Sequence, residues 1–231
     1  MLDFAQFSTL SFDCYGTMID WETGILSALR PILAAHQKDI TDVTLLELYS
    51  ELELAAEQKE FLNYWDVLES VVRGFGNRLG FEPTATEIRS LSESLSRWEP
   101  FPDTVTSLRK LKQRYKLAVI SNIDDNLFAL TAPKLGVQFD CLTTAQQARC
   151  YKPCKKIFEL ARERMGVSTG EWLHVGQSIY HDVIPAQSLG ISTVWVNRPS
   201  PRAGAGATKA ASGKPDLEVG SLAEFADATG M

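Results

Sequence analysis

Four sets of reactive or ligand-binding side chains follow short apolar runs in this sequence. They comprise a carboxylate, a hydroxyl beside an amide, an ammonium and a second carboxylate. Ligands and reacting groups of open α/β sheets gather outside the carboxyl ends of the strands, so these side chains are expected to converge on one crevice. Such a combination predicts an activated nucleophile. The four sets are Asp13 after Leu10–Phe12, Ser121-Asn122 after Leu117–Ile120, Lys152 in the segment 148–153, and Asp182 after Trp172–Val175.

The apolar runs predict the strands of a parallel sheet. They alternate with longer amphipathic segments, such as Asp103–Tyr115 and Lys155–Met165, and this alternation is typical of α/β proteins. We therefore predict an α/β fold with a Rossmann-like, doubly wound parallel sheet of five or six strands. The expected strands are Thr9–Phe12, Leu117–Ile120, Cys141–Thr143, Trp172–Val175, Thr193–Val196 and, at an edge, Leu217–Val219.

The segment from about Trp21 to Trp98 breaks this alternation. Its apolar residues recur at helical spacing, which predicts three or four helices inserted directly after the first strand. We assign residues 1–17 and 99–231 to a core domain and residues 18–98 to a helical cap domain. The cap is expected to stand over the carboxyl end of the first strand and to exclude water.

The composition and net charge indicate which kind of molecule the chain binds. The chain has 231 residues, 45% of them hydrophobic, and a formal charge of −6 from 23 basic and 29 acidic side chains. This charge repels nucleic acid and anionic lipid, so a small-molecule substrate is the better expectation. The four cysteines show no paired metal-ligand spacing and are expected to be reduced. With no basic leader and no long apolar stretch, we expect a cytoplasmic protein that does not enter a membrane.

At the four reactive positions the sequence resembles the haloacid dehalogenase (HAD) superfamily. The four motifs of that family match Asp-Cys-Tyr-Gly-Thr at 13–17, Ser121-Asn122, Lys152-Pro153 and Gly-Gln-Ser-Ile-Tyr-His-Asp at 176–182. Each motif is weak alone, but the four in the right order are specific, and the resemblance covers nearly the whole chain, cap included. In that superfamily the first aspartate is a nucleophile that forms a covalent aspartyl intermediate. The resemblance gives this role to Asp13.

Two departures from the family's phosphatases select a branch. Phosphatases usually carry a second aspartate two residues after the nucleophile to protonate the leaving alcohol, and here that position is Tyr15, a phenol that gives up its proton reluctantly near neutral pH. They also bind Mg²⁺ through an acidic residue of the fourth motif, where this chain has Gln177. We therefore expect neither a metal nor another cofactor. Displacing halide from an sp³ carbon requires neither the acid nor the metal.

Asp-x-Tyr-Gly-Thr is typical of the L-2-haloacid dehalogenases, and the remaining motifs also match their pattern. The resemblance implies a homodimer that is a hydrolase of (S)-2-haloacid dehalogenase type. Asp13 would attack C2 of a short, anionic 2-haloalkanoate, and water would then hydrolyse the ester to a 2-hydroxy acid. The implied roles are Thr17 and Lys152 for stabilising the nucleophile, Ser121 for the substrate carboxylate, Asn122 for the halide, Asp182 with Lys152 for the water, and the backbone amides of Cys14 and Tyr15 for the anion.

Parts of the substrate shell differ from that family, and two alternatives stay open. The cap region 45–52 lacks the arginine that these dehalogenases use, and Phe158 and Ile179 replace a tyrosine and an asparagine. One alternative is a Mg²⁺-dependent phosphatase acting on a small phosphate ester, which sensitivity to EDTA would reveal. The other is a binding module that keeps the fold without chemistry, which absence of turnover would favour.

Two further polar features are expected to be structural. His174 lies inside an apolar strand, where a histidine is more often a hydrogen-bonded core residue than a base. The acidic run formed by Glu51, Glu53, Glu57 and Glu60 is expected to be a solvated helix face.

Overall fold

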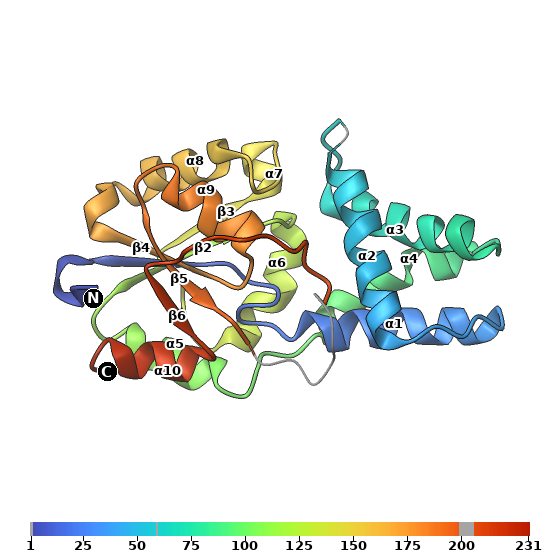
Figure 1. Cartoon of the computed structure of the whole chain (residues 1–231), viewed down its shortest axis with the longest axis horizontal. Coiled ribbons are helices and arrows are strands. Elements are labelled where there is room, and N and C mark those ends of the chain that lie inside the picture. Colours follow the sequence, from blue (N-terminus) through green and yellow to red (C-terminus); the bar gives the residue numbers. More distant parts are fainter. Residues whose placement is uncertain (1, 59, 199–205) are drawn as a thin grey trace. The chain divides into compact units, whose positions relative to one another are not determined.

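A six-stranded parallel sheet organises the larger part of the chain (Figure 1). The structure is a computed structural model and describes residues 2–58, 60–198 and 206–231. The strands lie in the order β3-β2-β1-β4-β5-β6, and every neighbouring pair is parallel. Their bounds are β1 Thr9–Phe12, β2 Lys116–Ser121, β3 Cys141–Thr144, β4 Trp172–Gly176, β5 Ser192–Val196 and β6 Leu217–Val219.

The strand order and the helices between the strands confirm the predicted doubly wound α/β fold. Helices α5 (Thr104–Leu111) and α10 (Leu222–Ala228) pack together on one face of the sheet, while α8 (Lys155–Met165) and α9 (Ile184–Gln187) lie on the other (Figure 1). Because both faces are covered, β1 is buried at every position, as its apolar run predicts. The shorter elements are α6 Asp125–Thr131, α7 Ala145–Ala148, the 3₁₀ turns Phe4–Gln6, Ala132–Leu135 and Thr169–Glu171, and the π-helical turn Ile179–Val183.

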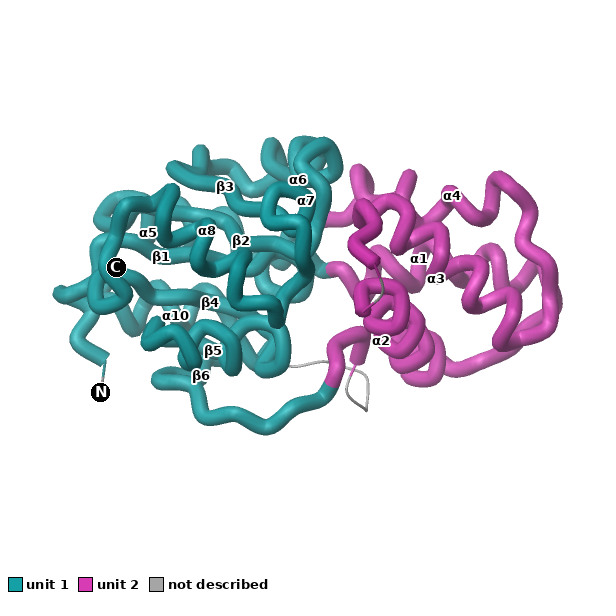
Figure 2. The backbone as a smooth tube through the Cα atoms, turned by 90° about the horizontal axis from the view of Figure 1, so that it is seen from above, with its two compact units in different colours: residues 1–20, 100–199, 210–231 teal, residues 21–99, 200–209 magenta. Residues whose placement is uncertain are grey.

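The chain divides into two units, shown in different colours in Figure 2. The first unit contains residues 1–20, 100–199 and 210–231 and holds the whole sheet. The second contains residues 21–99 and 200–209. Its four α-helices in the described part of the chain are α1 Trp21–Ala35, α2 Asp42–Glu57, α3 Tyr64–Leu79 and α4 Ala85–Ser94, followed by a 3₁₀ turn at Leu95–Arg97.

Local sequence signals define the ends of the helices in the second unit. Thr84 accepts a hydrogen bond from the backbone of Glu87, whose carboxylate bonds back to the backbone of Thr84, so a capping box begins α4. Helix α3 ends at Gly80, whose φ of +71° lies in the left-handed region that glycine adopts without strain. Gly24 of α1 packs so closely against Trp98 that a Cβ atom would lie 2.5 Å from the indole ring.

The expectation of a solvated acidic face was wrong for Glu53. Glu51 is exposed and Glu57 is half-buried, but the side chain of Glu53 is buried. It points at two tyrosine hydroxyls, which accounts for its burial: Tyr49 and Tyr64 donate hydrogen bonds to Glu53 Oε1 at 2.8 and 2.6 Å. Helical spacing alone does not reveal which position of an acidic run faces a hydroxyl partner.

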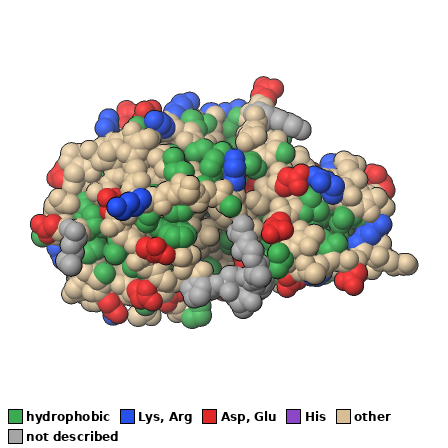
Figure 3. Space-filling model, viewed as in Figure 1, with side chains coloured by type: hydrophobic (Ala, Val, Ile, Leu, Met, Phe, Trp, Pro, Cys, Tyr) green, Lys and Arg blue, Asp and Glu red, His purple; other side chains and the backbone are tan. Residues whose placement is uncertain are grey.

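Charged side chains of both signs are interspersed on the face of the molecule in Figure 3. Among the described residues, no helix combines the length and the apolar character that a membrane span requires.

Candidate active site

The candidate site lies at the carboxyl ends of β1 and β4, between which the order of the strands reverses. The turn after β1 fixes its first residue, because the backbone N–H of Asp13 donates to the carbonyl of Val175 at 2.9 Å. The carbonyl of Cys14 then accepts from the backbones of Met18 and Ile19. Gly16 adopts a φ of +91° in this turn. These contacts fix the backbone that carries the Asp13 carboxylate at the end of β1.

Lys152 joins the two carboxylates of the site. Its ammonium Nζ lies 2.7 Å from Asp13 Oδ1 and 2.7 Å from Asp182 Oδ1, and it donates a third hydrogen bond to the carbonyl of Ile120 at 3.0 Å. An ammonium has three N–H donors, so these contacts use all of them. The remaining oxygen of Asp13, Oδ2, accepts a hydrogen bond from Thr17 Oγ1 at 2.8 Å. The structure thus brings together Asp13, Thr17, Lys152 and Asp182, the four residues expected to be catalytic.

Burial sets the electrostatics of this group. Only 2% of the Lys152 side chain is exposed, and Asp182 is equally enclosed. Burial raises the pKa of Asp182, but the charge of Lys152 and the hydrogen bond from His174 outweigh it, so the pKa lies below its ordinary value. Burial, helped by the charge of Asp182, raises the pKa of Asp13 above its ordinary value, although Lys152 and Thr17 oppose the rise. Asp182 therefore holds its negative charge more firmly than Asp13 does.

Asp182 is positioned by the segment that follows β4. It lies in the π-helical turn, and its Oδ2 accepts a hydrogen bond from the backbone N–H of Ser178 at 3.2 Å. Its carboxyl group packs against Gly176, where a Cβ atom would lie 2.5 Å from Asp182 Cγ. Only glycine leaves room for this carboxylate beside the strand.

The residues expected to bind substrate differ in their burial and in their hydrogen-bond partners. Ser121 ends β2, and its buried Oγ has no hydrogen-bond partner in the described part of the structure. A buried hydroxyl without a partner is costly, so this atom is a ready donor for a bound anion. Cys14 is fully buried in the turn after Asp13. Tyr15 is half-buried, and its hydroxyl lies 2.8 Å from Thr131 Oγ1 of α6.

Asn122 has partners that the sequence did not suggest. Its Nδ2 donates to the carbonyl of Lys152 at 3.2 Å, and its Oδ1 accepts from the backbone N–H of Lys152 at 2.7 Å. The side chain thereby fixes the loop that carries the ammonium. Its expected contact with halide stays a prediction.

The donor set does not fit a divalent cation. The position between the two carboxylates is taken by the Lys152 ammonium, and Gln177 offers an amide where an acidic ligand would be needed. Within residues 2–58, 60–198 and 206–231, no group of three or more histidine, cysteine, aspartate or glutamate side chains is placed to hold a metal ion.

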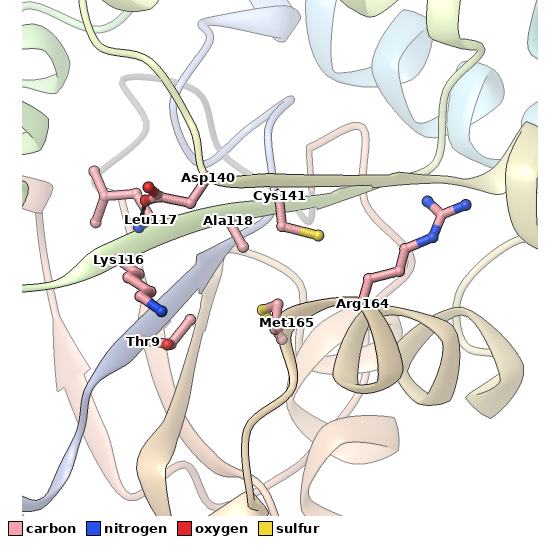
Figure 4. Close-up of a pocket in the computed structure, with 8 residues that line it drawn as sticks. All are labelled: Thr9, Lys116, Leu117, Ala118, Asp140, Cys141, Arg164 and Met165. Atoms are coloured by element: carbon pink, nitrogen blue, oxygen red, sulfur yellow. Dashed lines mark hydrogen bonds between the residues drawn. The ribbon is translucent and has the colours of Figure 1, made fainter.

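A cavity of about 230 Å³ lies at the other end of the strands, beside their amino ends (Figure 4). Thr9, Lys116 and Cys141, which line it, stand at the amino ends of β1, β2 and β3, and Arg164 reaches it from α8. Since Asp13 and Asp182 follow the carboxyl ends of their strands, this cavity is separate from the candidate site.

The sequence analysis did not predict the contact between His174 and Asp182. His174, expected to be a core residue, is indeed buried, but its Nε2 lies 3.2 Å from Asp182 Oδ1. The available signal was Ser11, a polar residue in the apolar run of β1 that is the register partner of His174. Two polar side chains in register inside a buried sheet indicate a hydrogen-bonded network.

A family model and a relative of known activity both match most of this chain. A family model described as haloacid dehalogenase-like hydrolase matches residues 7–190. The chain is 26% identical over 192 residues to an (S)-2-haloacid dehalogenase of Pseudomonas sp. (strain YL), covering 82% of each protein.

Two solved structures are similar to this one in fold. The L-2-haloacid dehalogenase from Xanthobacter autotrophicus with chloropropionic acid covalently bound has a TM-score of 0.78 and 21% identity, with 96% of this chain and 97% of that one covered. YfnB from Bacillus subtilis, a HAD hydrolase bound to magnesium, has a TM-score of 0.80 and 19% identity, with 97% and 99% covered.

Proposed function

Because the chain belongs to the haloacid dehalogenase-like hydrolases, we propose that it hydrolyses short 2-haloalkanoic acids to 2-hydroxy acids. The proposed reaction proceeds through a covalent ester on Asp13 and requires no metal. The proposed enzyme is of the (S)-2-haloacid dehalogenase type, as are several relatives of similar sequence. We further propose that the substrate is a small anion.

One observation carries this proposal: the nucleophile is supported by an ammonium and a hydroxyl, but no carboxyl group stands two residues beyond it. Tyr15 occupies that place, and its hydroxyl is engaged with Thr131. Burial raises the pKa of Tyr15 well above its ordinary value, which makes the phenol a still weaker acid. An alkoxide leaving group would receive no proton from this position, whereas a halide needs none.

In the first half-reaction a carboxylate oxygen of Asp13 attacks C2 of the substrate. A C–O bond forms as the C–halogen bond breaks, and the halide departs with the bonding electrons. The Asp13 oxygens are held by Lys152 and Thr17 before substrate arrives, so little reorganisation is needed. The chloropropionic acid covalently bound in the Xanthobacter dehalogenase supports an intermediate of this kind.

In the second half-reaction water attacks Cγ of the Asp13 ester. The water oxygen remains on the Asp13 carboxylate, the Cγ–O bond to the substrate breaks, and the original Asp13 oxygen leaves as the hydroxyl of the 2-hydroxy acid. One proton is released overall for each halide. Asp182 is the proposed orienting group for this water, because it is ionised, buried and linked to Asp13 through the same ammonium.

The substrate carboxylate requires a donor in the site. Ser121 supports this role, since its buried hydroxyl lacks a partner among the described residues and stands at the end of the strand next to β1. A hydroxyl that gains a hydrogen bond on binding favours a polar, anionic ligand over an apolar one.

The test is halide release and 2-hydroxy acid formation from chloro-, bromo- and fluoroacetate and from both enantiomers of 2-chloropropionate. We expect release that EDTA does not affect and that Asp13→Asn abolishes. Asp227→Asn is a matched control, because Asp227 is exposed and pairs with Lys110 of α5 rather than with a residue of the site. Hydrolysis of phosphate esters that depends on Mg²⁺, with no halide released, would move the chain to the phosphatases.

A further inference from the structure

A line of buried polar side chains leads from Asp182 into the sheet, and the proposed mechanism leaves it without a role. It consists of His174 and Trp172 on β4 and Ser11 on β1. Ser11 and His174 are register partners on adjacent strands, so their side chains stand side by side. Each of the three is at most 1% exposed.

The distances make this line a continuous hydrogen-bonded chain. Trp172 Nε1 lies 2.7 Å from Ser11 Oγ, and Ser11 Oγ lies 2.7 Å from His174 Nδ1. The other ring nitrogen of His174, Nε2, lies 3.2 Å from Asp182 Oδ1. Asp182 Oδ1 in turn contacts Lys152, which contacts Asp13.

The chemistry of the donors fixes the direction of the chain. An indole N–H can only donate, so Ser11 Oγ accepts from Trp172. The ionised Asp182 carboxylate can only accept as well, so His174 must carry a hydrogen on Nε2. Nδ1 of the neutral ring is then an acceptor for the hydroxyl hydrogen of Ser11. A neutral imidazole whose Nδ1 accepts carries its hydrogen on Nε2. His174 therefore donates to Asp182.

Packing holds the ring in this orientation. The Phe158 ring of α8 meets the His174 ring edge to face, with 5.1 Å between centroids and an interplanar angle of 89°. With Ser11 on one nitrogen and Asp182 on the other, a turned ring would lose both hydrogen bonds in a buried environment. The tautomer and the orientation are thus set by the buried residues packed around the ring.

We infer that His174 is a positioning residue that aims the Asp182 carboxylate at the water of the second half-reaction, an inference that rests on the proposed function. Asp182 Oδ1 is shared between His174 and Lys152, and Oδ2 accepts a single hydrogen bond among the described residues, from the backbone of Ser178. Without His174 the carboxylate is free to turn toward the ammonium. Attack by Asp13 on the substrate does not use Asp182, so the defect falls on ester hydrolysis.

The kinetic test separates the two half-reactions in the full-length protein. His174→Phe keeps a planar ring but removes both hydrogen bonds, whereas the amide nitrogen of His174→Gln can still donate to Asp182. For His174→Phe we expect a first turnover of halide release at close to the wild-type rate, then steady-state turnover slowed about tenfold or more. Intact mass should show the Asp13 ester accumulating. His174→Gln should recover much of the steady-state rate.

A loss shared equally by the first turnover and the steady state, with no ester accumulating, would assign His174 a merely structural role and overturn the inference. Equal behaviour of the Phe and Gln variants would overturn it as well.

A second measurement needs no substrate and therefore separates failure of this inference from failure of the proposed function. Nitrogen-15 NMR of the wild-type protein should show His174 protonated on Nε2 only, and Ser11→Ala should disturb this tautomer. A histidine protonated on Nδ1 would overturn the inference whatever the protein's activity. If the wild type releases no halide from any 2-halo acid, the proposed function fails. The tautomer then decides whether His174 orients Asp182.

Discussion

The chain buries carboxyl groups in two clusters, one in each unit, and the two clusters stabilise the buried negative charge with different partners. In the sheet unit Asp13 and Asp182 each lie 2.7 Å from the ammonium of Lys152. In the helical unit Glu53 is bound by the hydroxyls of Tyr49 and Tyr64, which also lie 3.1 Å from each other. The first cluster contains a cation, whereas the two hydroxyls that bind Glu53 are neutral.

The pKa values follow this difference. Asp182, beside the ammonium, has a pKa below its ordinary value despite complete burial. Burial raises the pKa of Glu53 to about 7, even though both tyrosine hydrogen bonds act to lower it. Two neutral hydroxyls do not replace one ammonium in stabilising a buried negative charge. Within the sheet cluster Asp182 keeps its negative charge, whereas Glu53 of the helical cluster changes its charge near neutral pH.

Removing the cation should produce the largest effect. Lys152→Met leaves two buried carboxylates without compensation, and we expect the free energy of unfolding at pH 7 to fall by about 3 to 5 kcal/mol. Lys155→Met removes an exposed lysine nearby and should change it by less than about 0.5 kcal/mol. Urea denaturation of both variants measures the difference. Similar losses in the two variants would mean that the buried ammonium does not stabilise its cluster.

The helical cluster should make stability depend on pH. The folded-state pKa of Glu53 is raised from 4.5 to about 7, so its favourable contribution is complete below pH 4.5 and is lost as pH rises toward 7. Between these values the wild type should lose about 3 kcal/mol relative to Glu53→Gln, which does not titrate. Urea denaturation at a series of pH values tests this. A difference that does not vary with pH would refute the raised pKa.

The sheet cluster should instead make activity depend on pH. Asp13 must be ionised to attack, and its raised pKa places the acid limb of kcat/KM at a higher pH than an ordinary aspartate would give. Below that pKa the rate should fall about tenfold per pH unit. Halide release across the pH range measures it. Glu53→Gln should retain this limb, and its disappearance in that variant would show that the helical cluster, rather than Asp13, controls the rate.

The smallest expected effect sharpens the role of the hydroxyls. Tyr64→Phe removes a hydrogen bond that lowers the pKa of Glu53, so the stability transition should move to higher pH. At neutral pH the variant should lose about 1 kcal/mol of unfolding free energy. Tyr115→Phe, which removes a hydroxyl contact with the carbonyl of Phe4 in the sheet unit, should leave that transition unchanged. A transition that moves equally in both variants would contradict the assignment.

Much of the fold could be predicted because buried parallel strands are short, continuous apolar runs. Thr9–Phe12 and Leu217–Val219 have the predicted bounds, and the other four strands each extend one residue further, β2 at both ends and the others at one end. The end of the helix in the amphipathic segment Asp103–Tyr115 could not be predicted as closely. Its helix ends at Leu111, because the next residues form tight turns in which Gln113 and Arg114 bond three residues back. Periodicity does not distinguish such turns from a helix.

The sequence by itself determined which residues are available for chemistry and in what order they come. Asp13, Ser121, Lys152 and Asp182 follow recognisable strands, and an α/β sheet collects such positions at one edge. It could not reveal that Asn122 binds the backbone of Lys152, nor that His174 binds Asp182, because side chains with several donors and acceptors can satisfy them in many ways.

Only the tertiary structure decided how the charges are paired. Lys152 and Asp13 are 139 positions apart, and they meet because only β2 separates β1 from β3 in the sheet and Asn122, at the end of β2, holds the loop that carries Lys152. The sequence predicts that Glu53 lies on a solvated helix face, yet Tyr64 of α3, eleven residues later, donates a hydrogen bond to its buried carboxylate. A carboxylate's charge state depends on burial and on the nearest cation or hydroxyl, and these are properties of distances between residues that the chain itself keeps far apart.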